Sequence, residues 1–500
     1  MAENLKKKAF WGIYWNYINI FGMQLLSLLP AMILTRLLSQ ADYGLLAMAG
    51  VFTGIAYMLA DGGFGNALVQ KKDADDLDYC SVFYFNISIC SFIYLIFFLI
   101  APYCADFFHQ PQLTAIIRVS TLGLVVLAFG SVQGIIFKKN LDYKLPTYRN
   151  FVAQILSVVT GIALALLGYG VWSLVFQGLV YTATSSIANW AISEWKPSFK
   201  FSYQRLKGLF NYGSKLLITS FIDYGFTNAY NIIIGKFYTP VKLADYNRGS
   251  QTVGMFSGIF FGVFKKVTFP LFVKMQDDNE RLRYNIRRFL VVSSMVIFFV
   301  MVVAFTLSKP IYHTLYSSKW DSAIPFFQVF CVAELFHPMV AILESVLLAK
   351  GESGKYLILS LCRKVFVVIS ILITYRLGVM YMVVGQVFLS IIDIILLTYF
   401  TNMLIQYKLS DLVKDLAPYL GVSIFMGAII YSVNLFFTWA ISLLSMSEFV
   451  TSILILLVNG LFAVVVFVLT YKSFRLKGYQ ELISFIRESV GDYKILKFIS

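Results

Sequence analysis

Residues 289–308 read FLVVSSMVIFFVMVVAFTLS, a run of twenty residues without one charged side chain. The hydrocarbon core of a bilayer is about 30 Å thick, and an α-helix of about 20 residues crosses it. A run of this length and composition therefore predicts a transmembrane helix.

The rest of the chain has the same character. Of its 500 residues, 59% are hydrophobic and 13% are charged, whereas an average soluble domain has about 25% charged residues. So much apolar surface needs lipid around it, and we predict an all-α polytopic membrane protein. Apolar runs between charged or turn-rich breaks give about 14 transmembrane helices: 10–34, 43–60, 80–103, 113–137, 147–167, 170–192, 213–236, 245–273, 289–308, 323–349, 355–376, 378–404, 416–443 and 449–471.

The distribution of basic residues predicts the orientation of these helices. With the N-terminus in the cytoplasm, the inside segments carry 28 Lys and Arg residues and the outside segments carry 7. Cytoplasmic loops are enriched in Lys and Arg, and a missed helix would scramble the alternation downstream. We therefore expect both termini in the cytoplasm. The net charge of +15 reflects this asymmetry, and we expect no nucleic-acid partner.

Three pairs of short, weakly similar sequence segments, each pair separated by about 203–212 residues, suggest a duplication. They follow the first and seventh spans, the fourth and tenth, and the fifth and eleventh. Because six is an even number, two six-helix lobes would have the same topology and form a parallel repeat, and transporters built from repeats place their site between the lobes. The predicted domains are an N-lobe at 1–200, a C-lobe at 201–407, two C-terminal helices at 408–471 and a cytoplasmic tail at 472–500.

Three stretches resemble a known family. They are LTRLLSQADYGLLAMA at 34–49, DGGFGNALVQ at 61–70 and FPLFVKMQDDNERLR at 269–283. The chain resembles the polysaccharide transporters, which are Wzx-type flippases for O-antigen, exopolysaccharide or teichuronic acid units. Their superfamily also holds multidrug extruders and the lipid II flippase. The resemblance implies a bacterial inner-membrane protein that flips undecaprenyl-diphosphate-linked oligosaccharide to the outer leaflet by alternating access. It implies membrane lipids, a polysaccharide polymerase and glycosyltransferases as partners.

Charged residues inside predicted spans are candidates for function, because a charge at mid-bilayer costs about 2.5–3.5 kcal/mol on insertion scales. We predict that Asp223, Glu334, His337 and Asp393 bind a coupling cation, H⁺ or Na⁺. The alternative is a purely structural role, in which Asp393 or Glu334 forms an ion pair with Arg363.

Basic and amide side chains are the candidates for substrate binding. Guanidinium groups suit phosphate oxygens because they bind them in a bidentate manner. The residues predicted to bind diphosphate or sugar are Arg36, Arg118, Arg248, Arg363, Lys364 and Asn16.

Motifs for catalysis are missing from the sequence. Gly351-Glu352-Ser353-Gly354-Lys355 lacks the spacing of a phosphate-binding loop, and no nucleophile elbow or HExxH motif occurs. We expect no enzymatic activity, no cofactor and no metal site. Two alternatives stay open: a cation-coupled exporter of drugs or other small molecules from the same superfamily, and a membrane-embedded glycosyl polymerase or ligase.

Overall fold

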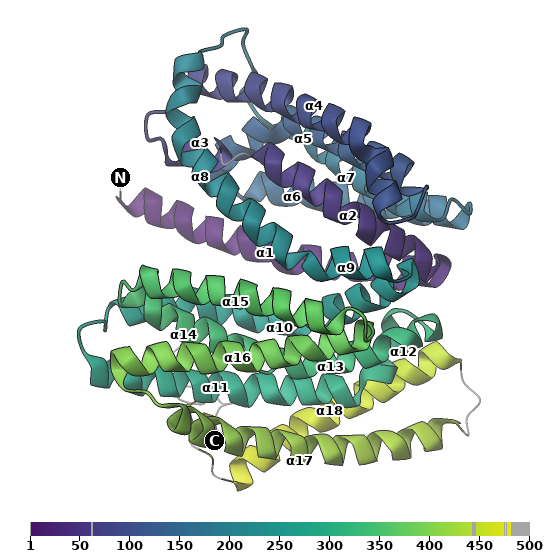
Figure 1. Cartoon of the computed structure of the whole chain (residues 1–500), viewed down its shortest axis with the longest axis vertical. Coiled ribbons are helices and arrows are strands. Elements are labelled where there is room, and N and C mark those ends of the chain that lie inside the picture. The colour runs from purple at the N-terminus through teal and green to yellow at the C-terminus, as the bar shows by residue number, and fades with distance from the viewer. Residues whose placement is uncertain (1, 62–63, 443–446, 475, 477, 482–500) are drawn as a thin grey trace. The chain divides into compact units, whose positions relative to one another are not determined.

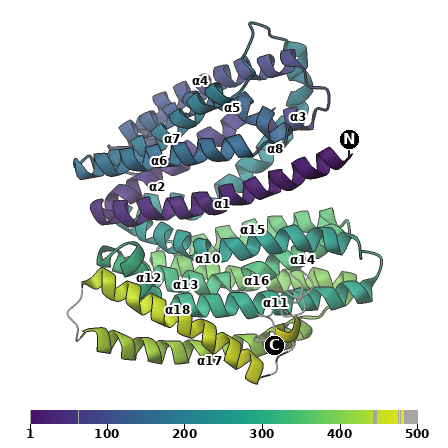
Figure 2. The ribbon, with the colours of Figure 1, turned by 180° about the vertical axis from the view of Figure 1, so that it is seen from behind.

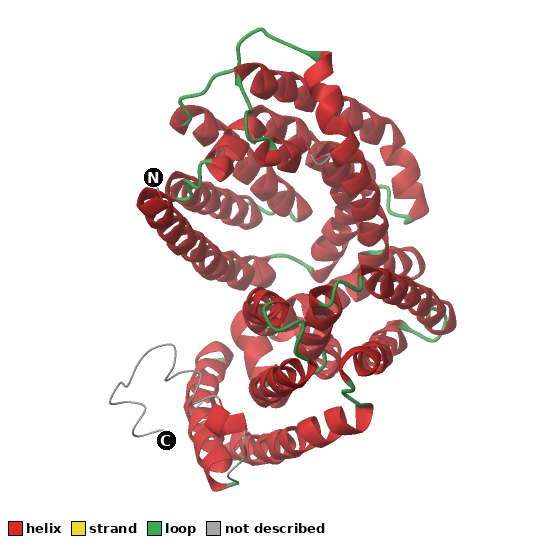
Figure 3. Cartoon of the chain, turned by 90° about the vertical axis from the view of Figure 1, so that its left-hand side faces the viewer, coloured by secondary structure: helices red, strands yellow, loops and turns green. Residues whose placement is uncertain are grey.

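The computed structural model describes residues 2–61, 64–442, 447–474, 476 and 478–481. Helices joined by turns and loops make up this part of the chain, and no strand occurs in it (Figure 3). The predicted all-α class is confirmed. The helices form two compact units, residues 1–244 and 245–500.

The first unit contains nine helices and the first residues of a tenth (Figure 1). They are α1 (Ala2–Leu37), α2 (Gln40–Asp61), α3 (Phe64–Gln70), α4 (Asp76–Phe107), α5 (Leu113–Lys139), α6 (Lys144–Leu166), α7 (Val171–Ile192), α8 (Tyr203–Thr227), α9 (Ala229–Phe237) and the start of α10 (Pro240–Val273).

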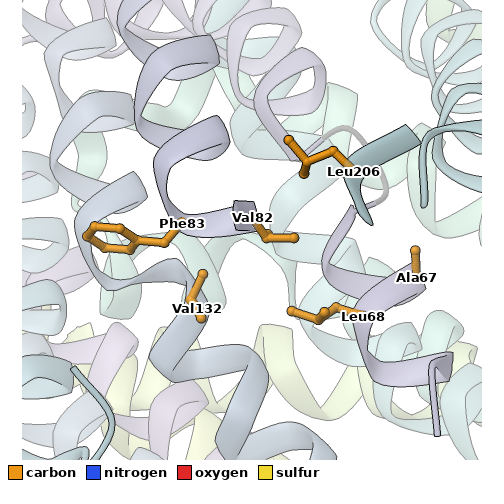
Figure 4. Packing of buried hydrophobic residues seen from close by; sticks show 6 residues of the cluster. All are labelled: Ala67, Leu68, Val82, Phe83, Val132 and Leu206. Atoms are coloured by element: carbon orange, nitrogen blue, oxygen red, sulfur yellow. The ribbon is translucent and has the colours of Figure 1, made fainter. Parts of the chain in front are cut away.

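Packing in the first unit runs from helix to helix. α4 packs on α5, α5 on α7, α7 on α6 and α6 on α1, while α2 contacts α4, α5, α7, α8 and α9. Figure 4 shows how α8 joins this unit: its Leu206 belongs to the same buried cluster as side chains of α3, α4 and α5. The residues of the cluster are Ala67, Leu68, Val82, Phe83, Val132 and Leu206.

Local sequence sets the helix ends in this unit. Asp75 caps α4 by accepting a hydrogen bond from the Asp78 amide, and the Asp78 carboxylate accepts one from the Asp75 amide. This reciprocal capping box satisfies two amides that lack a partner in the first turn. Between α6 and α7, Gly168 and Gly170 have φ of +82° and +55°, a left-handed backbone that glycine adopts without a steric penalty.

The second unit contains the remaining helices, seen from behind in Figure 2. They are the rest of α10, then α11 (Asn279–Thr306), α12 (Ser308–Leu315), the 3₁₀-helix η1 (Ser318–Ala323), α13 (Ile324–Glu334), α14 (His337–Ala349), α15 (Ser353–Thr374), α16 (Val379–Ile405), α17 (Leu409–Ser442) and α18 (Glu448–Ser473).

Helix α11 is the central helix of the second unit. It contacts α13, α14, α16 and α17, and α17 in turn contacts α18. In contrast, the outer face of α15 exposes Leu361, Val365 and Leu372. An apolar face of this kind without charges is suited to contact lipid rather than water.

Eleven helical segments of the described chain are long and apolar enough to cross a membrane. The multi-pass membrane class is therefore confirmed, and the count of fourteen stays a prediction. The other three predicted spans correspond to α7, to α8 together with α9, and to α10. Polar residues such as Gln177 and Asn189 lower the mean hydropathy of α7, and α8 and α10 include side chains outside the described residues, at 208–216 and 259–267.

The boundary between the two compact units falls between residues 244 and 245 of the sequence, whereas the predicted N-lobe ends at residue 200. The prediction rests on an internal repeat, and compactness does not test a repeat. The lobe boundaries therefore stay a prediction. Most of the predicted tail, 472–500, lies outside the described residues.

Candidate functional site

The predicted tenth span, 323–349, contains a break at its centre. α13 ends at Glu334 and α14 begins at His337, with Pro338 in the first turn of α14. Proline has no amide hydrogen, and the first turn of a helix is where that amide would lack an intrahelical partner, so Pro338 suits the start of a new helix. Transporters often build their sites at such discontinuous helices.

This break brings Glu334 and His337 together. His337 Nδ1 lies 3.1 Å from Glu334 Oε2. The sequence predicted one continuous span at 323–349, and the structure instead places the two residues on either side of an interruption. The imidazole is half exposed and the carboxylate is mostly buried, so the imidazole is the more accessible partner of the pair.

Arg363 on α15 joins two further carboxylates. Its Nε lies 2.9 Å from Asp393 Oδ1 on α16, and its Nη1 forms an ion pair with Glu344 on α14. The exposed fractions of the three side chains are 21% for Arg363, 13% for Glu344 and 27% for Asp393. The structure thus contains the ion pair of Asp393 with Arg363 that the structural alternative predicts, together with a second carboxylate, that of Glu344.

A cavity of about 330 Å³ contains both groups of charges. Three carboxylates (Glu334, Glu344 and Asp393) and one guanidinium leave a formal charge of −2 while His337 is neutral. Uncompensated charge is expensive in a low-dielectric interior. An arrangement of this kind therefore favours uptake of a proton or another cation. On α16 the cavity is lined by Gln386, Ser390 and Asp393, which share one helix face at spacings of four and three residues.

Glu344 was missed in the sequence analysis. It lies seven residues after His337, close to two full helical turns, so both side chains project from the same face of α14. This spacing was the available signal. The spacing could not show that α15 places Arg363 against that face, since this depends on the packing of α14 on α15.

The other predicted residues of the second unit lie outside this cluster. The Arg248 guanidinium on α10 is buried between the rings of Tyr316 and Trp320, at 4.8 and 4.7 Å from their centroids. Such cation–π contacts are attractive and hold the Arg248 guanidinium against these two rings. Lys364, next to Arg363, is half-buried and does not line the cavity.

The predicted residues of the first unit are not brought together either. Arg36 ends α1 and donates from Nη1 to the Met32 carbonyl at 2.7 Å. Arg118 on α5 donates to the Phe98 carbonyl at 3.0 Å, and its guanidinium lies 4.2 Å from the Phe98 ring centroid. Asn16 is half-buried on α1, and Asp223 is exposed on α8.

A second, apolar cavity of about 540 Å³ lies between α11, α13 and α17. The two cavities share α13, because Phe330, Ala333 and Glu334 line the charged cavity while Cys331 and Val332 line the apolar one. Helix α13 therefore separates a charged space from a hydrocarbon-like space.

A polytopic helical bundle with a broken helix at a charged cavity has the architecture of a secondary transporter. Comparisons with known proteins give the family. The chain belongs to the family described as "Polysaccharide biosynthesis protein", whose sequence profile matches residues 33–325. The predicted family resemblance is confirmed.

Individual proteins that are similar in sequence to this chain are consistent with this family. The chain is 23% identical over 355 residues to the lipopolysaccharide biosynthesis protein WzxC of Escherichia coli (strain K12), covering 70% of this chain and 71% of that protein. It is 22% identical over 357 residues to the teichuronic acid biosynthesis protein TuaB of Bacillus subtilis (strain 168), covering 70% and 73%. In fold, it is similar to the lipid II flippase MurJ in an inward closed conformation, with a TM-score of 0.70, 15% identity and coverage of 94% and 100%.

Proposed function

We propose that this protein is a flippase for an oligosaccharide linked to undecaprenyl diphosphate. It moves this lipid from the cytoplasmic to the outer leaflet of a bacterial inner membrane by alternating access. The family, the names of the relatives WzxC and TuaB, and the likeness of fold to a lipid II flippase support this assignment. The 28 to 7 asymmetry of basic residues supports an orientation with both termini in the cytoplasm.

The observation that carries the proposal is the pair of cavities on the two sides of α13. One cavity is charged and the other is lined mainly by apolar side chains of α11, α13 and α17. The apolar cavity suits the hydrocarbon chain of a lipid-linked sugar, and the charged cavity supplies a place for the ion that drives its transport. A small hydrophilic solute would have no use for the apolar cavity.

The charged cavity is the proposed site of ion coupling. Arg363 already has two carboxylate partners, so a third anion such as a diphosphate would meet net negative charge there. We therefore assign Arg363 to the coupling cluster rather than to phosphate binding. His337 and Glu334 form the pair that takes up and releases a proton, while Asp393 and Glu344 hold Arg363 in place.

Reconstitution into proteoliposomes tests the proposal. A fluorescent lipid-linked oligosaccharide is placed in the membrane, and a leaflet-specific quencher reports the fraction that has crossed. We expect flipping that depends on the pH gradient in the wild type and loses this dependence in His337→Gln. The matched control is His109→Gln, which removes a histidine of the loop between α4 and α5, outside the cluster.

Two outcomes would overturn the assignment. Export of small cationic dyes without movement of the lipid would identify a multidrug exporter. Polymerisation of the oligosaccharide in the vesicles would identify a polymerase or ligase.

A further inference from the structure

Arg149 lies inside a membrane span of the first unit. It belongs to α6, five residues after the first residue of that helix, which places it about 7.5 Å along the helix axis. Tyr148, the residue before it, packs on Trp15 of α1 at 5.3 Å between ring centroids. Because Trp and Tyr gather at the membrane–water interface, these rings place Arg149 near the depth of the lipid headgroups.

Amide side chains hold the guanidinium of Arg149 in place. Its Nε and Nη2 donate to Asn150 Oδ1 at 3.1 and 2.7 Å, and its Nη1 donates to Asn189 Oδ1 of α7 at 2.6 Å. Each amide is itself oriented from its other end. Asn150 Nδ2 donates to Asn19 Oδ1 of α1 at 3.0 Å, and Asn189 Nδ2 donates to the Gly130 carbonyl of α5 at 2.8 Å.

These contacts distinguish Arg149 from an arginine that extends to water. A surface arginine at the end of a span would project its head toward the solvent. Arg149 instead turns toward Asn189, a side chain that is only 6% exposed. Four helices, α1, α5, α6 and α7, contribute to this arrangement. Such a brace fixes the position of a group before a ligand arrives, which reduces the entropy cost of binding.

The charge of Arg149 is not neutralised by the residues around it. Within the described part of the chain, no carboxylate lies within ion-pairing distance of its guanidinium. Arg363 in the second unit has two. A guanidinium has five N–H donors, and three of them are used by the amides, so two remain for a ligand. Charged groups inside spans usually pair with one another, and the partner of Arg149 is therefore to be sought outside the chain.

We infer that Arg149 is the anion-binding centre of a subsite for the phosphate groups of the substrate, on the cytoplasmic side of the first unit. The inference rests on the proposed function and on the proposed orientation. The ligand chemistry is a phosphate or diphosphate at headgroup depth, bound by the two remaining N–H donors and by the unneutralised charge. The sequence alone does not reveal this site, because Asn19, Asn150 and Asn189 belong to three different helices.

The test compares two variants that act on the charge in different ways. Arg149→Gln removes the cation. Asn189→Asp keeps Arg149 and supplies a carboxylate at the position of the amide, so it neutralises the site and adds an ion pair. A purely structural role of Arg149 would be preserved in Asn189→Asp, whereas anion binding would be lost. Lys144→Gln is the matched control, since it removes one positive charge from the exposed first residue of the same helix.

Binding of farnesyl diphosphate to the full chain in phosphatidylcholine nanodiscs is the readout. Hydrogen bonds to charged groups contribute enough that we expect binding to weaken about 10- to 100-fold in Arg149→Gln and Asn189→Asp. Lys144→Gln should stay within about 2-fold of the wild type, because exposed charges act weakly. Farnesol, which lacks the diphosphate, should bind equally weakly to all four proteins. Competition by inorganic diphosphate would support the assignment to the phosphate groups.

Three results would overturn the inference. The first is wild-type affinity for farnesyl diphosphate in Asn189→Asp. This variant retains Arg149, so it keeps the test valid even where Arg149→Gln folds poorly. The second is wild-type affinity in a well-folded Arg149→Gln. The third is displacement of the probe by phosphatidylglycerol in the nanodisc, which would show a binding site for a membrane lipid. Failure of the proposed function looks different: the wild type would bind the probe and flip no lipid-linked oligosaccharide.

Discussion

Replacing Arg363 by Ala tests how the charged cluster of the second unit is held together. The change leaves Glu344 and Asp393 facing one cavity without the cation that joins them. Breaking a buried ion pair from one side costs about 3–5 kcal/mol, and exposed pairs contribute about 0–1 kcal/mol. These side chains are 13–27% exposed, so we expect a loss of about 2–4 kcal/mol in the free energy of unfolding.

Denaturant unfolding of the purified full chain in detergent measures this loss. The matched control is Arg205→Ala, which removes the same side chain from a largely exposed pair with Asp75 at 3.2 Å and from a longer contact of 3.7 Å with the buried Asp78. Asp78 keeps its ion pair with Lys71 at 2.6 Å, so this change should cost under about 1 kcal/mol. A triple variant, Arg363→Ala with Glu344→Gln and Asp393→Asn, removes the unpaired negative charges as well. It should recover most of the stability, because neutral amides avoid the cost of isolated buried charges.

Two results would refute this reasoning. If Arg363→Ala is as stable as Arg205→Ala, the cluster does not depend on the guanidinium. If the triple variant is no more stable than Arg363→Ala, the loss came from packing and not from unpaired charge.

Three further predictions follow from the spans, the cluster and the loops. In a chain without its native cysteines, Ser318→Cys should label from the outside and Asp277→Cys from the inside, and labelling of both from one side would contradict the fourteen-span topology. Asp393→Asn should reduce stability but keep the dependence of flipping on the pH gradient if Asp393 holds Arg363, and loss of that dependence with normal stability would show that Asp393 itself carries the ion. The Asp78 amide holds the pKa of Asp75, in the loop before α4, below its usual range. The carboxylate of Asp75 therefore stabilises the fold above its unfolded-state pKa, and this contribution is lost as the pH falls through the native pKa. The difference in melting temperature between wild type and Asp75→Ala should therefore shrink on acidification. A difference that does not depend on pH would contradict the capping role.

The sequence was sufficient to predict the class of the protein, the family and most of the spans. Hydropathy and charge are sums over neighbouring residues, and a span such as 289–308 is recognisable without its partners because lipid, and not a particular helix, is its environment. The family also follows from stretches that are continuous in the chain. For the same reason, Glu334, His337, Arg363 and Asp393 were recognised individually as charges that need an explanation.

Only the tertiary structure decided which of these charges meet. Glu344 reaches Arg363 from 19 residues away and Asp393 from 30, and both contacts depend on how α14, α15 and α16 face one another. Asn189 reaches Arg149 in the same way, across 40 residues and from another helix. The periodicity of a single helix shows which side chains share a face, but the face of the neighbouring helix that packs against it is set by the shape and volume of many side chains at once. The partners of a buried charge, and with them its role, are therefore properties of the packed bundle.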